Sequence, residues 1–284
     1  MHCPPQSAET REFVFTPGDF DRIRSLIRER AGICLSATKH EMVYSRLARR
    51  LRARGVGRFS EYVALLDSRD PEEWQAFVNA LTTNLTSFFR EAHHFSELAA
   101  HVDALRRRRN PHVNVWCCAS STGEEPYSIA MTMIDAFGSY TPPVSIIATD
   151  VDTNVLATAE AGTYPAERVG RFTQDQVRRF FLRNGSGDSG AVTVRPELRS
   201  LVRFRQVNLL DPQWPVRGPF DAIFCRNVMI YFDKPTQRRL VERLAPLLSP
   251  DGLLFAGHSE SLLHSAHVLK LRGNTVYERA RAAA

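Results

Sequence analysis

The sequence predicts an α/β protein in which a helical N-terminal domain precedes a mostly parallel sheet. Residues 16 to 90 carry apolar side chains at helical spacing throughout. From residue 113 onward, short apolar runs of strand length alternate with helical segments, a pattern typical of a parallel sheet covered on both faces. The chain has 284 residues, of which 43% are hydrophobic and 24% charged, so it can form one large globular domain or two smaller ones.

The helical region begins with a helix in "TPGDFDRIRSLIRERAGI". Thr16 and Asp19 form its capping region, Gly32 ends it, and apolar residues recur at helical spacing in between. The next helix, "KHEMVYSRLARRLRARG", has one apolar face and a basic remainder that contains Arg46, Arg49, Arg50, Arg52 and Arg54. Two more helical segments, "FSEYVALLDS" and "PEEWQAFVNALTTN", follow. We therefore predict a flexible N-terminus over residues 1 to 15 and a helical domain over residues 16 to 90.

The remaining residues, 91 to 284, form the predicted α/β domain. Its strand candidates are Val113 to Ala119, Val144 to Thr149, Val202 to Asn208, Ala222 to Cys225 and Leu253 to Gly257, with a final antiparallel pair around His267 to Leu271 and Thr275 to Arg279. The alternation is interrupted at about residues 163 to 201, which are polar and include the Gly-rich stretch "NGSGDSG". We expect a helical turn and a short hairpin there, inserted as a small β-subdomain.

Composition narrows the possible functions. No apolar run is long enough to cross a bilayer, and the N-terminus lacks a signal-peptide pattern, so we expect a cytoplasmic protein. The five cysteines have neither disulfide nor metal-site spacing, which predicts buried reduced thiols and no metal. The net charge of +6 suggests an acidic partner, such as nucleic acid, a membrane surface or an acidic protein.

The turn after the first strand, "ASSTGEEPY", is unusual for a nucleotide-binding turn. It has one glycine, and Glu124 and Glu125 stand at the helix start, where a phosphate would need positive charge. Two first-turn glutamates can simply stabilise the helix dipole. However, Asp150 ends the next strand, where such folds place the acid that accepts bonds from ribose hydroxyls. A cationic nucleoside without phosphate, such as S-adenosylmethionine, fits this acidic site.

Two other segments add polar groups. The later strand ends "VNLLD" and "FCRN" supply Asn208 and Asn227, which can bind adenine or the methionine part. The junction segment "LTTNLTSFFREAHHF" contains poor helix formers in series, so its hydroxyls and amide are available either to bind a ligand or to cap the next helix. In this segment Arg90 follows two phenylalanines, which favours an orientation toward a carboxylate.

The motifs "ALTTNLTSFFREAHHF", "ASSTGEEPYSIAM", "ATDVD", "NLLD", "GPFDAIFCRNVMIYFDK" and "LSPDGLLFAGHSE" together resemble those of the bacterial chemotaxis receptor methyltransferases, the CheR family, over about residues 16 to 280. The resemblance implies a Rossmann-like S-adenosylmethionine methyltransferase sheet with an N-terminal all-α domain and a small inserted β-subdomain. It also implies O-methylation of glutamate side chains on methyl-accepting chemotaxis receptors, which gives glutamyl methyl esters and S-adenosylhomocysteine.

By motif, the resemblance implies specific site residues. The cofactor-binding set is Asn84, Thr86, Arg90, Glu125, Asp150, Asn208, Leu209, Cys225, Arg226 and Asn227. Arg90 and Tyr231 are the implied catalytic residues, which orient the cofactor carboxylate or the acceptor glutamate. The β-subdomain corresponds to the part that docks a receptor tail in some members. The acidic receptor helices would meet the basic helix through Arg46, Arg49, Arg50 and Arg54, although a basic face is often only solvated.

The implied reaction needs no general base, because a glutamate acceptor is ionised at neutral pH. Alignment should therefore supply most of the catalysis, and His93, His94 and His258 are predicted to be structural. Two alternatives remain. A nucleic-acid methyltransferase would share the sheet and basic surface, but the fourth strand ends "CRNVMIY" rather than in an Asn-Pro-Pro-aromatic segment. A non-catalytic S-adenosylmethionine sensor would keep the cofactor pocket and relay its occupancy.

Overall fold

The computed structural model describes residues 11–68, 70–108, 112–184 and 190–280. Its contacts divide the chain into two compact units, Met1–Thr82 and Thr83–Ala284. The sequence placed this boundary at residue 90, so the junction segment from Thr83 onward belongs to the larger unit. Within the part that the structure describes, no helix is long and apolar enough to span a membrane.

The first unit is helical, with α1 (Pro17–Ala31), α2 (His40–Arg54), α3 (Phe59–Asp67), α4 (Pro71–Leu81) and the short 3-10 helix η1 (Ala37–Lys39). The Thr16 hydroxyl accepts the Asp19 N–H, and the Asp19 carboxylate accepts the Thr16 N–H, which forms the capping box expected at the start of α1. The apolar faces of these helices bury a core that includes Ile23, Ile27, Val43, Leu47, Leu51, Phe59 and Phe77.

Residues 11–15 do not behave as the flexible segment expected from the sequence. Phe13 and Phe15 are buried, and Val14 forms a parallel β-bridge with Arg58. The Phe15 ring packs on that of Phe59 with 4.2 Å between centroids. Aromatic burial therefore fixes this stretch on the helical unit, while residues 1–10 of the expected flexible segment lie outside the described residues.

The second unit contains a seven-stranded sheet in the order β6-β2-β1-β7-β8-β10-β9. The parallel strands are β1 (Val113–Cys118), β2 (Val144–Asp150), β6 (Val202–Gln206), β7 (Phe220–Cys225) and β8 (Leu248–Phe255). Antiparallel β9 (Leu269–Gly273) and β10 (Val276–Arg279) end the sheet. The strand order reverses between β1 and β7, where ligands bind in such sheets.

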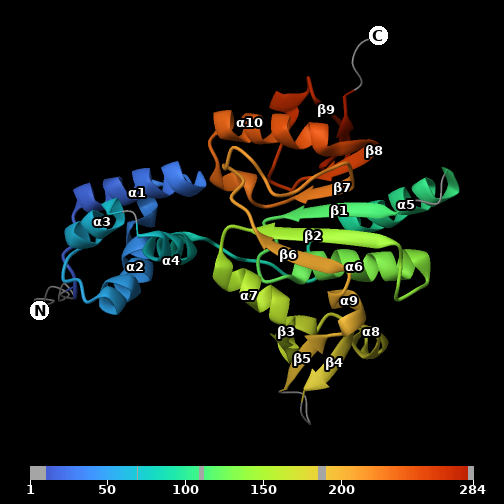
Figure 1. Ribbon diagram of the computed structural model, residues 1–284, viewed down its shortest axis with the longest axis horizontal. Helices are drawn as coiled ribbons and strands as arrows, with labels where there is room; N and C mark the ends of the chain where they lie inside the picture. Colours follow the sequence, from blue (N-terminus) through green and yellow to red (C-terminus); the bar gives the residue numbers. More distant parts are fainter. Residues whose placement is uncertain (1–10, 69, 109–111, 185–189, 281–284) are drawn as a thin grey trace, which may run out of the picture. The chain divides into compact units, whose positions relative to one another are not determined.

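Helices cover both faces of this sheet (Figure 1). On one face, α5 (His93–Arg108) and α6 (Glu124–Phe137) share a core with Val115 and Cys117. On the other, α10 (Lys234–Leu244) packs with Trp116 and Cys118. The remaining helical elements of the sheet are α7 (Thr153–Ala161), η3 (Met229–Tyr231), η4 (Ala245–Leu247) and η5 (Leu263–Ser265).

The insert contains a three-stranded antiparallel sheet, β3-β5-β4, rather than the single hairpin expected. Its elements are β3 (Thr163–Pro165), η2 (Ala166–Val169), α8 (Gln174–Phe180), β4 (Phe181–Asn184), β5 (Ala191–Val194) and α9 (Pro196–Arg199). The third strand was missed because β3 is only three residues long. Most of the expected Gly-rich loop, residues 185–189, lies outside the described residues.

The cysteines agree only in part with the prediction of buried thiols. Cys117, Cys118 and Cys225 are buried and free, but Cys34, which is also free, is exposed just after α1. Cys3 lies outside the described residues. The three buried thiols all belong to the central strands β1 and β7, so they contribute to packing within the sheet.

Candidate cofactor and methyl-transfer site

The turn between β1 and α6 forms the first wall of the candidate site. Gly123 adopts φ +98°, and a Cβ there would lie 2.8 Å from the Tyr164 hydroxyl oxygen and 2.9 Å from the Ala159 Cβ. Tyr164 donates from that hydroxyl to the Thr122 carbonyl at 2.7 Å. The single glycine of the turn therefore permits close packing against the insert and α7.

Asp150, at the end of β2, joins this turn to the second strand. Its carboxylate accepts the Ser121 N–H at 2.8 Å and the Asp152 N–H at 3.0 Å. Burial raises the pKa of Asp150 to about 6, against the opposing effect of these backbone N–H groups. Asp150 thus places a buried carboxyl group at the carboxyl end of the sheet, with its orientation fixed by backbone bonds.

The junction segment lies along the same edge. Asn84 donates from Nδ2 to Asp152 Oδ2 at 2.9 Å, and the Ser121 hydroxyl donates to the Asn84 carbonyl at 3.3 Å. Thr86 accepts at its carbonyl a bond from Arg168 Nη1 at 3.1 Å, and the same nitrogen lies 3.6 Å from Glu124 Oε1. The residues predicted from the junction, the turn and β2 are therefore neighbours.

Arg226 is the buried centre of the site. Its Nη1 donates to Glu125 Oε2 at 2.6 Å, and its Nη2 donates to the Arg90 carbonyl at 2.5 Å. The same Nη2 lies 3.3 Å from Glu91 Oε2. Arg226 therefore connects the junction segment, the first turn and the end of β7, and it partly neutralises two carboxylates.

The two carboxylates beside Arg226 respond differently to their surroundings. Burial raises the pKa of Glu125, although the Arg226 charge and the Cys117 thiol, 3.3 Å away, oppose it. Burial also raises the pKa of Glu91, but the Arg226 charge and the Asn227 amide outweigh it, so the pKa of Glu91 lies below its ordinary value. This side of the site therefore keeps negative charge in a poorly solvated place.

The other predicted residues lie at the same strand ends. Val207, which precedes Asn208, donates its N–H to the Asp150 carbonyl at 2.9 Å. Asn208 turns its Oδ1 to the Leu210 N–H, and the buried Leu209 accepts Arg243 at its carbonyl. Cys225 is buried at the end of β7, and the half-buried Tyr231 ends η3 beside the α10 core.

Backbone strain collects around these groups. Among the described residues, the non-glycine residues at positive φ include Phe89 and Glu91 in the junction, Ala119 and Ser121 in the first turn, and Asn227 after β7. Non-glycine residues rarely adopt this conformation, and it persists where surrounding contacts enforce it, as they do at binding sites. The strain thus marks the same three segments that the polar contacts join.

The residues present fit a cationic nucleoside better than a phosphate. Carboxyl groups of the buried Asp150 and Glu125 and of the half-buried Glu91 face this edge. A pyrophosphate would be repelled, whereas an ammonium or sulfonium group would be stabilised.

Comparison with known proteins agrees with this chemistry. Residues 84–277 match the family model described as the CheR methyltransferase SAM-binding domain, and residues 18–82 match the CheR methyltransferase all-alpha domain. The chain belongs to the CheR methyltransferase family. Chemotaxis protein methyltransferase 2 of Pseudomonas aeruginosa is 53% identical over 95% of this chain and 96% of its own length. The chemotaxis protein methyltransferase of Klebsiella aerogenes is 56% identical over 91% of this chain and 88% of its own length.

The family assignment confirms the predicted fold class, with its N-terminal all-α domain and S-adenosylmethionine-binding sheet. It also confirms S-adenosylmethionine as the cofactor and a methyltransferase of chemotaxis as the type of protein.

Several residues of the candidate site were not predicted from the sequence. Glu91 directly follows Arg90 in the motif "ALTTNLTSFFREAHHF", and Asp152 lies two residues after Asp150 in the motif "ATDVD". Their contacts with Arg226 and Asn84 join segments more than sixty residues apart in the chain. Arg168 has no local signal at all, since it contacts Thr86 and Glu124 from the insert.

His94 is buried and structural, as the sequence predicted. Its Nε2 lies 2.9 Å from the Asn274 carbonyl, and burial lowers its pKa to about 4. A neutral imidazole packed on Phe255 serves the core between α5 and β8 rather than proton transfer.

The basic helix of the first unit is used mostly inside that unit. Arg50 binds Glu73 through Nη2 at 2.6 Å and Nε at 3.1 Å, and Arg54 lies 3.2 Å from Asp70. Arg46 donates to the Thr82 carbonyl at 2.5 Å. Arg49 is exposed. Of the four arginines predicted to meet a partner, Arg46, Arg50 and Arg54 therefore also hold α2 against α4.

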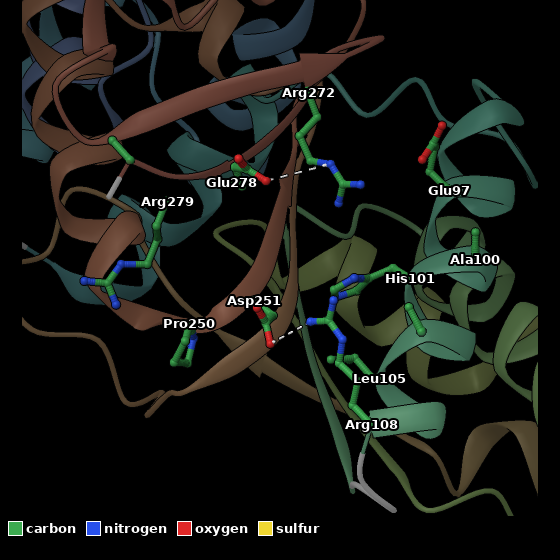
Figure 2. Close-up of a pocket in the computed structure, with 12 residues that line it drawn as sticks. Glu97, Ala100, His101, Leu105, Arg108, Pro250, Asp251, Arg272, Glu278 and Arg279 are labelled. Atoms are coloured by element: carbon green, nitrogen blue, oxygen red, sulfur yellow. Dashed lines mark ion pairs between the residues drawn. The ribbon is translucent and has the colours of Figure 1, made fainter. Parts of the chain in front are cut away.

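A groove of about 650 Å³ lies elsewhere in the second unit, between α5 and the β8-β10-β9 edge. Figure 2 shows Arg108 of α5 facing Asp251 of β8 across it at an ion-pair distance of 3.4 Å, and Arg272 of β9 facing Glu278 of the neighbouring β10 at 3.8 Å. Pro250 and Asp251 belong to the beginning of β8 and Arg279 to the end of antiparallel β10, so the groove is at the amino ends of the parallel strands. It is therefore separate from the candidate cofactor site.

Proposed function

We propose that this chain transfers a methyl group from S-adenosylmethionine to glutamate side chains of methyl-accepting chemotaxis receptors, in the cytoplasm. The products are glutamyl methyl esters and S-adenosylhomocysteine. The main support is the acidic edge of the sheet near the point between β1 and β7 where the strand order reverses. Asp150, Glu125 and Glu91 lie at this edge, its backbone is strained, and the chain belongs to the CheR family. Relatives that span nearly the whole chain are named chemotaxis protein methyltransferases, which supports the same substrate class.

We assign the cofactor contacts by position along this edge. Asp150 would hold the ribose, and Asn208 with Leu209 would line the adenine. Glu125, Arg90, Asn84 and Thr86 would surround the methionine part, and the β7 end with Cys225, Arg226 and Asn227 would close the site. Because the Arg226 guanidinium is committed to Glu125 and Glu91, it would act mainly by fixing those carboxylates.

The reaction requires alignment more than proton transfer. The cofactor, when bound, supplies an electrophilic methyl on a sulfonium. An ionised acceptor carboxylate needs no base, so the chain contributes by positioning it, where well-oriented groups gain effective molarities of about 10⁵ to 10⁸ M. Arg90 and Tyr231 are our catalytic candidates: Arg90 is half-buried beside the site, and Tyr231 ends η3 in the loop after β7, from which the acceptor would approach.

The receptor partner is proposed to meet two surfaces. The acidic receptor helices would approach the basic helix α2, with the exposed Arg49 as the principal contact. Arg46, Arg50 and Arg54 would add the part of their positive charge that their contacts within the helical unit do not neutralise. The three-stranded sheet of the insert is the proposed place where a receptor tail docks. Nucleic acid and membrane insertion are not part of this proposal.

The test is a methylation assay with labelled S-adenosylmethionine and either receptor membranes or RNA. We expect label on receptors that is released as methanol in base, because methyl esters hydrolyse and methylated amines do not. Label in RNA would instead indicate a nucleic-acid methyltransferase. Tight cofactor binding without transfer to either substrate would indicate a sensor, and both results contradict the proposed function.

A further inference from the structure

Glu260 is a buried carboxylate outside the residues assigned so far. It lies just after β8 and is only 4% exposed. Its Oε2 accepts the Gly257 N–H at 2.6 Å and the Asn227 N–H at 2.8 Å, and its Oε1 accepts the Ile230 N–H at 3.2 Å. One side chain therefore satisfies backbone donors from the loops that follow both β7 and β8.

Two of these donors, Asn227 and Ile230, belong to the loop after β7, which carries the proposed acceptor side of the site. Asn227 has φ +57°, and Ile230 lies within η3, which ends at Tyr231. The packing is tight, since a Cβ on Gly257 would lie 2.4 Å from Asn227 Nδ2 and 2.8 Å from Glu260 Oε2. The strained Asn227 and the turn to Tyr231 are thus held by a single carboxylate that neighbouring backbone encloses.

The same loop is connected to the centre of the site. Asn227 Nδ2 donates to Glu91 Oε1 at 3.2 Å, and Glu91 lies 3.3 Å from Arg226, which binds Glu125. A polar network therefore runs from Glu260 through Asn227 to the groups beside the proposed methionine part. A shift of the loop would change both the place of Tyr231 and the partner of Glu91.

A carboxylate suits this position better than any other side chain. It offers two oxygens and no donor, which matches converging N–H groups, whereas an amide would turn its NH₂ toward at least one of them. Burial raises the pKa of Glu260, and the backbone bonds from Gly257, Asn227 and Ile230 oppose that change. Protonation or replacement would leave buried N–H groups without a full set of acceptors.

We propose that Glu260 is a positioning residue for methyl transfer, which holds the Asn227–Tyr231 loop in the geometry that the acceptor glutamate requires. This proposal rests on the proposed function. Glu260 would act through Tyr231 and Asn227 rather than by touching the cofactor. Since a misplacement of about 1 Å can cost about 100-fold in rate, loss of this anchor should lower turnover more than cofactor affinity.

The test compares Glu260→Gln with wild type and with Glu278→Gln, a carboxylate change in the groove at the opposite end of the sheet. We expect kcat for receptor methylation to fall about 10- to 100-fold in Glu260→Gln, with a clearly smaller rise in KM for S-adenosylmethionine. Glu278→Gln should keep both constants. Gly257→Ala keeps the Glu260 carboxylate but places a methyl group against Asn227, so it should reproduce the loss of kcat. If Glu260→Gln does not fold, Gly257→Ala serves as the test variant.

Amide hydrogen exchange provides a readout independent of activity. In Glu260→Gln the amides of Asn227 and Ile230 should exchange faster, while those of α6 and β2 keep their protection. The proposal would be overturned by any of three results: wild-type kcat in a folded Glu260→Gln variant, unchanged amide exchange in the loop, or an equal loss of cofactor affinity and turnover. If wild type itself does not methylate receptors, the proposed function fails, and the exchange data still decide whether Glu260 holds the loop.

Discussion

At the scale of single residues, Asp150 is predicted to make cofactor binding sensitive to pH. Its pKa is about 6 in the folded chain because burial disfavours the charged form. Above that pH the carboxylate can accept ribose hydroxyl bonds, and below it the protonated group cannot accept them as well. We predict that affinity for S-adenosylhomocysteine falls as pH drops through about 6, by up to about tenfold per unit. Calorimetric titration between about pH 5 and 8 would measure it.

Asp150→Asn is the control for this pH effect and should bind weakly with a flatter pH profile. The stability effect has the opposite sign. Because the folded pKa lies above the ordinary 3.8, Asp150 stabilises the ligand-free chain at low pH, and this contribution is lost as pH rises through about 6. A wild-type affinity that does not change across this range would contradict the ribose assignment.

The paired glutamates of the turn should differ in function. Glu125 binds Arg226 at 2.6 Å, whereas Glu124 accepts the Thr122 hydroxyl, also at 2.6 Å. We predict that Glu125→Gln weakens cofactor binding by about 10- to 100-fold, the value of a charge-assisted hydrogen bond, and that Glu124→Gln weakens it less. Thermal unfolding of both variants is needed, since Glu125→Gln also leaves the Arg226 charge less compensated. Equal affinities in folded variants would refute the assignment.

Arg90 is another residue whose role can be isolated. Its Nη1 donates to the Leu85 carbonyl at 2.7 Å, which leaves other N–H groups of the guanidinium to orient a carboxylate. We predict that Arg90→Ala loses about 100-fold or more of kcat/KM while the fold is retained, and that Arg90→Lys recovers part of it. Circular dichroism would verify folding, and near-wild-type turnover would exclude a catalytic role.

At the scale of elements, most helices and strands could be predicted from the sequence, because the periodicity of apolar residues and the presence of turn residues are local signals. Thr16 and Asp19 cap α1 as expected, and β1, β2 and β7 end within one residue of their predicted ends. The early start of β8 at Leu248 was missed because Ser249, Pro250 and Asp251 resemble a turn. The Arg226–Glu91 and Glu260–Asn227 contacts were missed because they depend on which strands become neighbours.

The turn before α6 offers an element-scale prediction with a control on the same helix. Gly123 and Gly138 flank α6, both at positive φ, but only Gly123 has atoms within 3 Å of the Cβ position. Gly123→Ala should therefore cost several kcal/mol and abolish cofactor binding, from strain plus overlap with Tyr164 and Ala159. Gly138→Ala should cost about 1 kcal/mol with binding intact. Denaturant unfolding and calorimetry would measure both, and similar losses would contradict this reading of the turn.

At the scale of the whole molecule, the charge of +6 belongs to a chain whose cofactor site is acidic. The positive charge is therefore carried by other surfaces and is available for an acidic partner. Arg49 is exposed on α2, whereas Arg50 and Arg54 pair with Glu73 and Asp70. The sequence gives the excess of basic over acidic side chains, but only the ion pairs within the folded chain show how much of this positive charge is exposed to a partner.

This distribution predicts that salt separates the two binding events. Receptor docking through exposed arginines is screened over about 10 Å at 0.1 M salt, whereas the buried contacts to the cofactor are screened far less. Raising salt from about 0.05 to 0.5 M should therefore increase KM for receptor membranes about tenfold and change the Kd of S-adenosylhomocysteine less than about twofold. Arg49→Ala should reduce the salt dependence and leave cofactor affinity unchanged. An equal loss of both affinities with salt would show that charge on α2 does not guide the receptor.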